Sequence, residues 1–374
     1  MRELVFALLS LLALNAVLQA KSRWRWKLRL VTLEFGHWLS LVCAGLVAWH
    51  WAFLLFVIVF LRPAWQASRI AKKHALPFSW LRLWFPRREG QNVIVTRTCA
   101  FEHDGEKIDV VVYTPAGDVA DFFQKSSPQP AQARFSEKIG HPPKRRCIVA
   151  LHTGGWDSGD PGEFPAANRE LAARCDVVIC SVGYRLAPKH PWPAQAEDTR
   201  RAIAWVRENS ASLGIDADDL ILLGRSAGAQ IATACAFGMP ELRVSTCIAV
   251  YGPPDMFFAR KWSYPDDILK SLKLVQQYMG GDPEDLPEVY RTASASEFVS
   301  EDSPATLLIH GESDSLVWVE HSRRLHAKMQ GLAHSSYLEL PWGDHGCDYF
   351  PSSPGGQLSL AMMERFLKAN AQAH

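Results

Sequence analysis

Short strand-like runs recur along the chain from residue 93 onwards, and helix-forming stretches separate them. These runs occupy residues 93–96, 107–113, 147–151, 177–182, 220–223, 244–250, 306–309 and 337–340. Apolar runs of four to eight residues bounded by turn signals are typical of buried strands. Helix-forming composition appears between them, for example at residues 194–208 and 229–237. Strands that alternate with helices predict a mostly parallel central sheet flanked by helices on both faces.

Two longer stretches interrupt this alternation. Residues 115–145 are polar and contain five prolines, which predicts an irregular insertion. Residues 251–300 carry methionine and several aromatic side chains, which predicts a small helical subdomain with an apolar core of its own. We therefore expect residues 91–374 to form one α/β domain with a helical cap at about 251–300.

The first 90 residues follow a different pattern and predict a membrane anchor. Residues 38–61 contain no Lys, Arg, Asp or Glu, and as a helix they would span about 36 Å, enough to cross a hydrocarbon core of about 30 Å. Residues 4–20 are also uncharged but would span only about 26 Å. They fit either a first transmembrane helix or the core of a signal peptide. We expect a two-helix hairpin in a bilayer, followed by an interfacial linker that ends near residue 90.

The balance of basic and acidic residues also changes near residue 90. Of the 40 Lys and Arg, 13 lie in residues 1–90, whereas only 3 of the 39 Asp and Glu do. These basic side chains flank apolar segments instead of gathering on the folded domain, which excludes a nucleic-acid-binding protein. They lie both between and after the two apolar segments, so the positive-inside rule leaves the membrane face of the catalytic domain open. Residues 69–88 mix basic and aromatic side chains, which fits either a segment on the lipid surface or a solvated linker.

The sequence Gly-Arg-Ser-Ala-Gly at residues 224–228 lies between a predicted strand and a predicted helix. Gly-x-Ser-x-Gly in this setting is typical of a nucleophile elbow, a turn so tight that side chains at its glycines would collide. The turn exposes the serine hydroxyl beside the N-terminus of the next helix. Ser226 is therefore the candidate nucleophile.

A serine hydroxyl needs a base to remove its proton, and a histidine oriented by a carboxylate suits that task. Among 13 histidines, His345 is favoured because glycines bracket it in a loop after the last predicted strand. Asp314 is the favoured acid and Glu312 is the alternative. Asp344 is disfavoured because side chains adjacent in sequence rarely meet in the required geometry. The resulting order of serine, acid and histidine is the order found in α/β-hydrolases.

Two further blocks complete a family pattern. His-Thr-Gly-Gly-Trp at residues 152–156 follows a predicted strand, and its glycine pair leaves backbone N–H groups unobstructed, as an oxyanion hole requires. Residues 183–194 read Gly-Tyr-Arg-Leu-Ala-Pro-Lys-His-Pro-Trp-Pro-Ala. Together with the elbow, these blocks make residues 91–370 resemble the hormone-sensitive-lipase branch of the α/β-hydrolases. That esterase and lipase family carries His-Gly-Gly-Gly and Tyr-Arg-Leu-Ala-Pro-Glu at the corresponding places.

The resemblance implies an α/β-hydrolase fold and a backbone oxyanion hole. By the family pattern, the oxyanion donors are the N–H groups of Gly154, Gly155 and Ala227. It also implies that the cap lies over the catalytic pocket, so that cap and loop side chains contact the acyl or alcohol group. The candidates for these contacts are Trp156, Met256 and Phe257. The chain departs from the family at Thr153, where a glycine is usual, at Arg225, where aspartate is frequent, and at Ala229, where glycine often follows the elbow.

These observations predict a membrane-anchored serine hydrolase that cleaves carboxylic esters, either lipid-like or small and amphiphilic, through an acyl-enzyme. Neither a metal nor an organic cofactor is expected. One alternative is an amidase or deacetylase of the same mechanism, such as an arylformamidase. The other is a non-catalytic binding protein on the same fold, although such proteins usually lack a member of the triad. The sequence indicates no oligomeric state.

Overall fold

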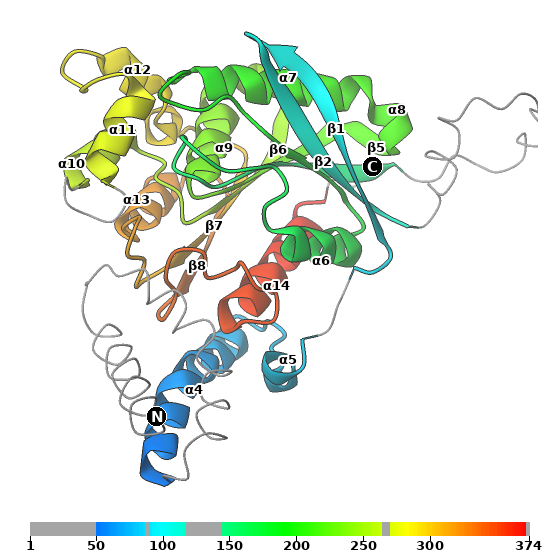
Figure 1. Ribbon diagram of the computed structural model, residues 1–374, viewed down its shortest axis with the longest axis vertical. Helices are drawn as coiled ribbons and strands as arrows, with labels where there is room; N and C mark the ends of the chain where they lie inside the picture. Colours follow the sequence, from blue (N-terminus) through cyan, green and yellow to red (C-terminus); the bar gives the residue numbers. More distant parts are fainter. Residues whose placement is uncertain (1–49, 87–89, 117–143, 264–269, 372–374) are drawn as a thin grey trace, which may run out of the picture.

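The computed structural model describes residues 50–86, 90–116, 144–263 and 270–371, and its centre is an eight-stranded sheet (Figure 1). The strand order is β1-β2-β4-β3-β5-β6-β7-β8. The strands are β1 (Val93–His103), β2 (Glu106–Pro115), β3 (Arg145–Leu151), β4 (Val178–Val182), β5 (Ile215–Arg225), β6 (Val244–Val250), β7 (Ala305–Gly311) and β8 (Ser335–Leu340). β2 pairs antiparallel with β1 and with β4, and every other neighbouring pair is parallel. The predicted mostly parallel sheet is confirmed.

The central strands are buried on both faces, which explains their unbroken apolar runs. In β3, Cys147 and Val149 belong to one apolar core, whereas Ile148 and Ala150 belong to the other. β5 and β6 alternate in the same way. Because successive side chains of a strand point to opposite faces, each central strand contributes to two cores.

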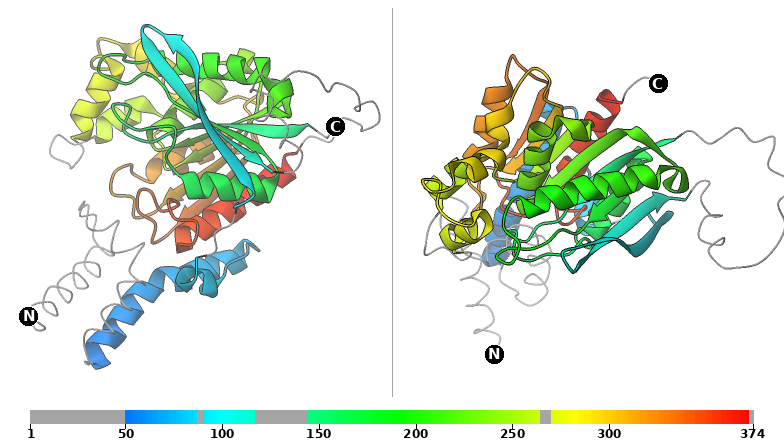
Figure 2. Two further views of the ribbon diagram at one scale, coloured as in Figure 1. Left: turned by 45° about the vertical axis from the view of Figure 1, so that its right-hand side comes forward. Right: turned by 90° about the horizontal axis from the view of Figure 1, so that it is seen from above.

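Helices cover both faces of the sheet, as Figure 2 shows. On one face lie α7 (Ala194–Glu208), α8 (Ser210–Leu213), α9 (Ala227–Gly238), the short 3₁₀ turn η1 (Pro240–Leu242) and α13 (Glu320–Met329). On the other face lie α6 (Pro165–Cys175) and α14 (Pro354–Ala369). α9 is buried along almost its whole length, so its alanine-rich sequence is what close packing against β5 and β6 requires.

The stretch between β6 and β7 is helical, as expected. It contains α10 (Met256–Trp262), α11 (Ser271–Met279), α12 (Pro287–Thr292) and the 3₁₀ turn η2 (Ala295–Phe298). Tyr278 of α11 is fully buried, stacks on Trp156 with 4.4 Å between ring centroids, and meets Trp192 edge-on. The cap therefore shares its apolar core with the α/β body instead of standing apart from it.

Before the sheet lie α4 (His50–Lys73) and α5 (Trp80–Trp84). α4 packs on α14 through small residues, Ala67 and Ala71 among them, while its amino-terminal end projects from the body (Figure 1). The predicted segment 4–20 lies outside the described residues, and so does the first half of 38–61, residues 38–49. Within residues 50–86, 90–116, 144–263 and 270–371, no helix combines the length and the apolar character needed to cross a membrane. Most of the predicted polar insertion, residues 117–143, also lies outside the described chain.

Candidate active site

The turn between β5 and α9 has the geometry of a nucleophile elbow. Ser226 has φ 54° and ψ −121°, a conformation that costs energy in any residue with a side chain. A Cβ atom on Gly228 would lie 2.3 Å from the carbonyl oxygen of Leu151, and one on Gly224 would lie 2.1 Å from that of Gly228. Both glycines are therefore required by backbone contacts, and the Gly228 contact brings the loop after β3 against the elbow.

Ser226, Asp314 and His345 meet at the carboxyl ends of three parallel strands. Ser226 follows β5, Asp314 follows β7, and His345 follows β8. The Ser226 hydroxyl lies 2.8 Å from Nε2 of His345, and Nδ1 of His345 lies 2.8 Å from Oδ2 of Asp314. Since a carboxylate only accepts, Nδ1 carries the proton and donates it to Asp314, which leaves Nε2 free to accept from the serine. The three residues form a continuous hydrogen-bonded relay.

Asp314 is held as a buried carboxylate. Its side chain is fully buried, and its Oδ1 accepts hydrogen bonds of 2.8 Å from the backbone N–H groups of Leu316 and Val317. Burial alone would raise the pKa of Asp314, but the neighbouring His345 and His310 outweigh it and hold this pKa below its usual range. Asp314 is therefore an anion near neutral pH.

The His345 side chain is 12% exposed, and its partial removal from water alone would lower its pKa. The Asp314 carboxylate outweighs that effect, with smaller contributions from Asp344 and Asp348, so the pKa of His345 lies above its usual 6.5. A carboxylate in this position favours the protonated, imidazolium form of the ring.

The other two acids considered from the sequence occupy different places. Glu312 is exposed, and its backbone N–H bonds to Leu340. Asp344 is buried, and its Oδ1 accepts from the backbone N–H of His345 and from both the N–H and the hydroxyl of Ser315, each at 2.8 Å. Asp344 thus connects the loop that carries Asp314 to the loop that carries His345.

The loop after β3 presents the predicted oxyanion donors. Gly154 and Gly155 have φ of 112° and 59°, and a Cβ on Gly154 would lie 2.1 Å from the carbonyl oxygen of Ser158. Within the described chain, the N–H groups of Gly154, Gly155 and Ala227 make no recorded hydrogen bond. Free backbone donors beside a nucleophile are what an oxyanion hole requires.

Thr153 explains how the loop keeps its shape without the family's first glycine. Its N–H and its hydroxyl both donate to the same carboxylate oxygen of Glu163, at 3.1 and 2.5 Å. His152 stacks on Tyr184 with 4.0 Å between ring centroids, and the Tyr184 hydroxyl donates to the His152 carbonyl. Because the Thr153 N–H is engaged with Glu163, the predicted donors of this loop begin with the Gly154 amide.

Of the three residues predicted to contact substrate, two are buried in the core under the cap. Trp156 is 5% exposed and donates from Nε1 to Gln230, which also accepts from the Tyr278 hydroxyl. Met256 is fully buried. Phe257 is half-buried against the same core and lies 5.5 Å from the ring of Tyr290. A contact between these side chains and substrate stays a prediction.

Several buried polar groups around the site have partners that sequence reasoning did not identify. His310 accepts from Ser322 at Nδ1, and its Nε2 lies 3.0 Å from the Val317 carbonyl and 3.3 Å from Asp314. Its place at the end of a strand, four residues before Asp314, was the one signal available. Arg185 pairs with the buried Asp198 of α7. The Tyr-Arg-Leu-Ala-Pro block therefore links the chain after β4 to α7 and has a structural part in the domain.

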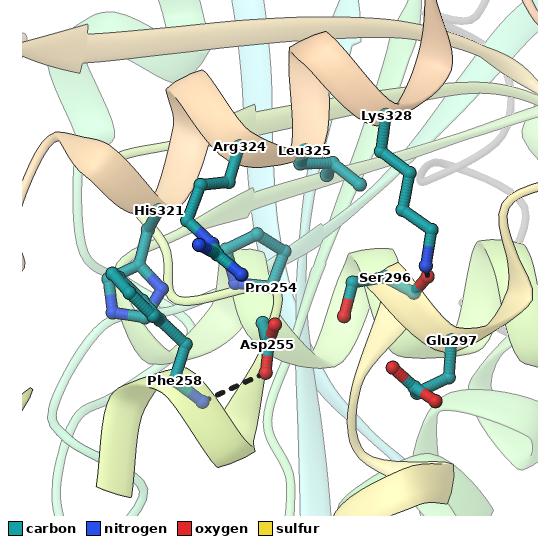
Figure 3. A pocket seen from close by; sticks show the side chains of 9 residues that line it. All are labelled: Pro254, Asp255, Phe258, Ser296, Glu297, His321, Arg324, Leu325 and Lys328. Atoms are coloured by element: carbon teal, nitrogen blue, oxygen red, sulfur yellow. Dashed lines mark hydrogen bonds between the residues drawn. The ribbon is translucent and has the colours of Figure 1, made fainter. Parts of the chain in front are cut away.

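A cavity of about 140 Å³ lies apart from the triad, between α10, η2 and α13 (Figure 3). It is lined by Pro254, Asp255, Phe258, Ser296, Glu297, His321, Arg324, Leu325 and Lys328. Burial lowers the pKa of His321 to about 3, so its ring is neutral near pH 7. None of the lining residues belongs to the triad or to the loop after β3.

Several known proteins are similar to this chain. Esterase LipQ of Mycobacterium tuberculosis is 31% identical over 222 residues, which cover 55% of this chain and 52% of the relative. Esterase LipC of the same organism is 30% identical over 58% of this chain and 56% of its own length. The chain thus spans about half the length of these curated relatives. Both names agree with the esterase and lipase resemblance predicted from the sequence.

Solved structures share the fold. Esterase LipW from Mycobacterium marinum aligns with a TM-score of 0.58 at 22% identity, covering 83% of this chain and 87% of its own. The hyperthermophilic esterase from Pyrobaculum calidifontis aligns with a TM-score of 0.57 at 21% identity, covering 83% and 90%. The predicted α/β-hydrolase fold is confirmed. The BD-FAE family model matches residues 138–329, just over half of the chain, and the chain therefore belongs to the BD-FAE family.

Proposed function

We propose that this protein is a serine carboxylesterase that cleaves carboxylic esters through an acyl-enzyme. The observation that carries the proposal is the relay from Ser226 through His345 to the buried Asp314, with 2.8 Å at each step. A non-catalytic binding protein has no need of this relay. The esterase names of the relatives support the same reaction class.

In the acylation step, the Ser226 hydroxyl attacks the ester carbonyl carbon while its proton passes to Nε2 of His345. The carbonyl oxygen becomes an oxyanion that accepts from the N–H groups of Gly154, Gly155 and Ala227. When the tetrahedral intermediate collapses, the C–O bond to the alcohol breaks. The imidazolium returns its proton to the departing alkoxide, which leaves as a neutral alcohol.

Deacylation repeats these steps with water. His345 takes a proton from the attacking water, the same backbone donors hold the second oxyanion, and the Ser226 oxygen leaves as the hydroxyl. The carboxylic acid is released and the enzyme returns to its starting state. Asp314 remains ionised throughout, because its part is to hold the ring and stabilise the imidazolium.

A Ser226→Ala substitution tests the proposal directly. We expect turnover of p-nitrophenyl acetate to fall by about 10⁶-fold and labelling by a fluorophosphonate probe to disappear. Ser300→Ala, at an exposed serine, is the matched control and should behave as the unsubstituted protein. Full activity in a folded Ser226→Ala protein would overturn the assignment.

Amide hydrolysis is the second candidate, supported by a partial relative. Arylacetamide deacetylase of Bos taurus is 38% identical over 96 residues, about a quarter of each chain. The same relay serves both reactions. The leaving nitrogen of an amide, however, must be protonated before its bond to the carbonyl carbon breaks, which makes the amide the more demanding substrate. We expect p-nitrophenyl esters of graded chain length to be hydrolysed faster than the matching p-nitroanilides, and the reverse ranking would favour the amidase.

We further propose that the amino-terminal part of the chain holds the catalytic domain at a bilayer. The 24 consecutive residues 38–61 without a formal charge support this. Exposed apolar side chains on and after α5 add support: Trp80 is 40% exposed, Leu81 58% and Phe85 68%. A bilayer would cover this surface and would deliver amphiphilic esters.

Extraction of membranes from cells that express the full chain tests the anchor. We expect the protein to remain with the membranes after an alkaline carbonate wash. Leu46→Arg with Leu54→Arg should release it, because each central arginine costs about 2.5–3.5 kcal/mol on insertion. Leu46→Ile with Leu54→Ile is the matched control and should remain bound. Release of the unsubstituted protein by carbonate would contradict an integral anchor.

A further inference from the structure

Arg225 is a buried cation directly before the nucleophile. It ends β5, is 3% exposed, and stacks over the Phe164 ring with 4.4 Å to the ring centroid. Its Nε donates to Oδ2 of Asp348 at 2.6 Å, and Nη1 lies 3.4 Å from Oδ1 of Asn168. A buried guanidinium is tolerated only when it is paired. Burial alone would lower the pKa of Arg225, but Asp348 outweighs it, so the group remains charged.

Asp348 links this cation to the catalytic histidine. Its side chain is 2% exposed and lies three residues after His345, in the same loop. Its second oxygen, Oδ1, accepts from the Tyr251 hydroxyl at 2.5 Å. Tyr251 is fully buried, and its ring centroid lies 4.7 Å from that of His345. Burial and Asp348 both raise the pKa of Tyr251, so its hydroxyl stays protonated and donates.

The three residues come from three different segments that all end at the active site. Arg225 is joined to Ser226, Tyr251 follows β6 directly, and Asp348 lies in the loop that carries His345. The backbone N–H of Tyr251 also donates to the carbonyl of Ile309 in β7, at 2.8 Å. The cluster therefore fixes the histidine loop to the elbow without a hydrogen bond to the Ser226 hydroxyl or to the His345 ring.

The charges around the cluster give it an electrostatic part as well. The acids that act on His345 are Asp314 from the loop after β7 and Asp344 and Asp348 from its own loop. Asp348 is paired with the Arg225 cation, whereas the hydrogen bonds of Asp344 come from the neutral Ser315 and from the backbone N–H of His345. The groups that face Arg225 are Asp348, the two buried tyrosines Tyr251 and Tyr113, Phe164 and Asn168.

We propose that Arg225, Asp348 and Tyr251 form a positioning cluster for the proposed esterase reaction, on which this inference rests. The cluster clamps the His345 loop onto the nucleophile elbow, and Arg225 neutralises Asp348 so that this third carboxylate acts less strongly on His345 than Asp314 does. Arginine stands where the family resemblance leads one to expect aspartate, and its partner Asp348 supplies the compensating charge. All three are positioning residues, since their side chains bond to one another and to Asn168 and not to Ser226 or the oxyanion donors.

Two substitutions that break the pair from opposite sides test the proposal. Arg225→Gln leaves the Asp348 anion unpaired beside His345, which stabilises the imidazolium. The acid limb of kcat/KM should then move to higher pH. Asp348→Asn leaves the Arg225 cation unpaired, which destabilises the imidazolium, so the limb should move to lower pH. We expect each shift to be about 0.5–1 pH unit and kcat to fall about tenfold or more from misplacement of the histidine.

The double variant Arg225→Gln with Asp348→Asn removes both charges and should return the limb towards its original pH. Arg146→Gln is the matched control. It breaks a partly buried ion pair with Asp219, 2.6 Å long, between β3 and β5 and away from the triad, in which the Arg146 side chain is 15% exposed. This control should lower the melting temperature without moving the limb. The proposal would be overturned if the acid limb of the kcat/KM profile stayed in place in both single variants or moved in the same direction in both.

Milder variants keep the proposal testable if those proteins do not fold. Tyr251→Phe keeps the ring beside His345 and removes the hydroxyl from Asp348, and kcat should fall with a small upward shift of the limb. Arg225→Lys keeps the charge but loses the fork geometry, and should lower kcat with the limb in place. Unchanged kcat in both would also overturn the cluster.

Fluorophosphonate labelling of the unsubstituted protein separates this test from the proposed function. A protein that neither labels nor cleaves any ester fails as an esterase, and the cluster then has no reaction to serve. An active protein whose variants show no opposite shifts refutes the positioning role alone.

Discussion

The two loops that carry Ser226 and His345 are held in place by different means. The elbow is fixed by contacts between backbone atoms, since neither Gly224 nor Gly228 has room for a methyl group. The histidine loop is fixed by buried carboxylates, Asp344 on its own backbone and on Ser315, and Asp348 on Arg225. One loop depends on the absence of side chains, and the other depends on their charges.

This difference has a mechanistic basis. The nucleophile must occupy one position, and a strained turn with no alternative packing provides that. In the proposed reaction the histidine must also change charge, so its surroundings must tolerate both the imidazole and the imidazolium. Carboxylates around the ring supply that tolerance, whereas steric contacts alone would not.

The largest effect is expected from Gly228→Ala in the elbow. The added Cβ would lie 2.3 Å from the Leu151 oxygen and 2.5 Å from the His152 oxygen. Either the elbow or the loop after β3 must move, and we expect activity to fall at least about 10³-fold, because donors of the oxyanion hole move with that loop. Gly238→Ala is the matched control, since its Cβ would come no closer than 3.4 Å to any atom. Similar kcat/KM values for the two variants would refute backbone control of the elbow.

Asp314→Asn tests the electrostatic support of His345 and should lower kcat by about 10⁴-fold. The asparagine oxygen can still accept from Leu316 and Val317, so the melting temperature should change little. Its NH₂ group, however, faces Nδ1 of His345 and favours the wrong tautomer. Glu312→Gln, two residues earlier, should retain full activity. Loss of activity in the Glu312 variant instead would make that residue the acid.

The smallest of these effects concerns the unsubstituted protein, in which the acid limb of kcat/KM should lie at a higher pH than an ordinary histidine would give. The base must be neutral to accept the serine proton, so kcat/KM falls as the pH drops through the pKa of His345. That pKa is raised, chiefly by Asp314 acting against burial, so the midpoint of the acid limb should lie above pH 6.5. A midpoint below that value would mean that burial outweighs the carboxylates around the histidine loop.

Most of the sheet could be predicted from the sequence because its signals are local. Each central strand is a short apolar run, and the elbow, the glycine pair and His345 all follow such runs. Parallel strands bring their carboxyl ends to one edge, so chain order alone brought Ser226, Asp314 and His345 to one site. Local pattern and fold agreed at these positions.

The pairing of buried charges could not be predicted in this way. Arg225 and Asp348 lie 123 residues apart, and nothing in either local sequence marks the other as its partner. The choice between Asp314 and Glu312 also depended on side-chain direction, which two neighbouring acids in one loop do not reveal. Trp156 and Met256 looked suited to a binding pocket, but large apolar side chains are equally suited to the core in which they lie.

One close contact in the elbow links two positions that the sequence does not connect. A Cβ on Gly252 would lie 2.4 Å from the Cβ of Ala229, so this part of the fold has room for a single methyl group shared between the two sites. The alanine that follows the elbow therefore forbids any side chain at position 252. We expect the two positions to have evolved as a pair: a relative with a side chain at the second should carry glycine at the first.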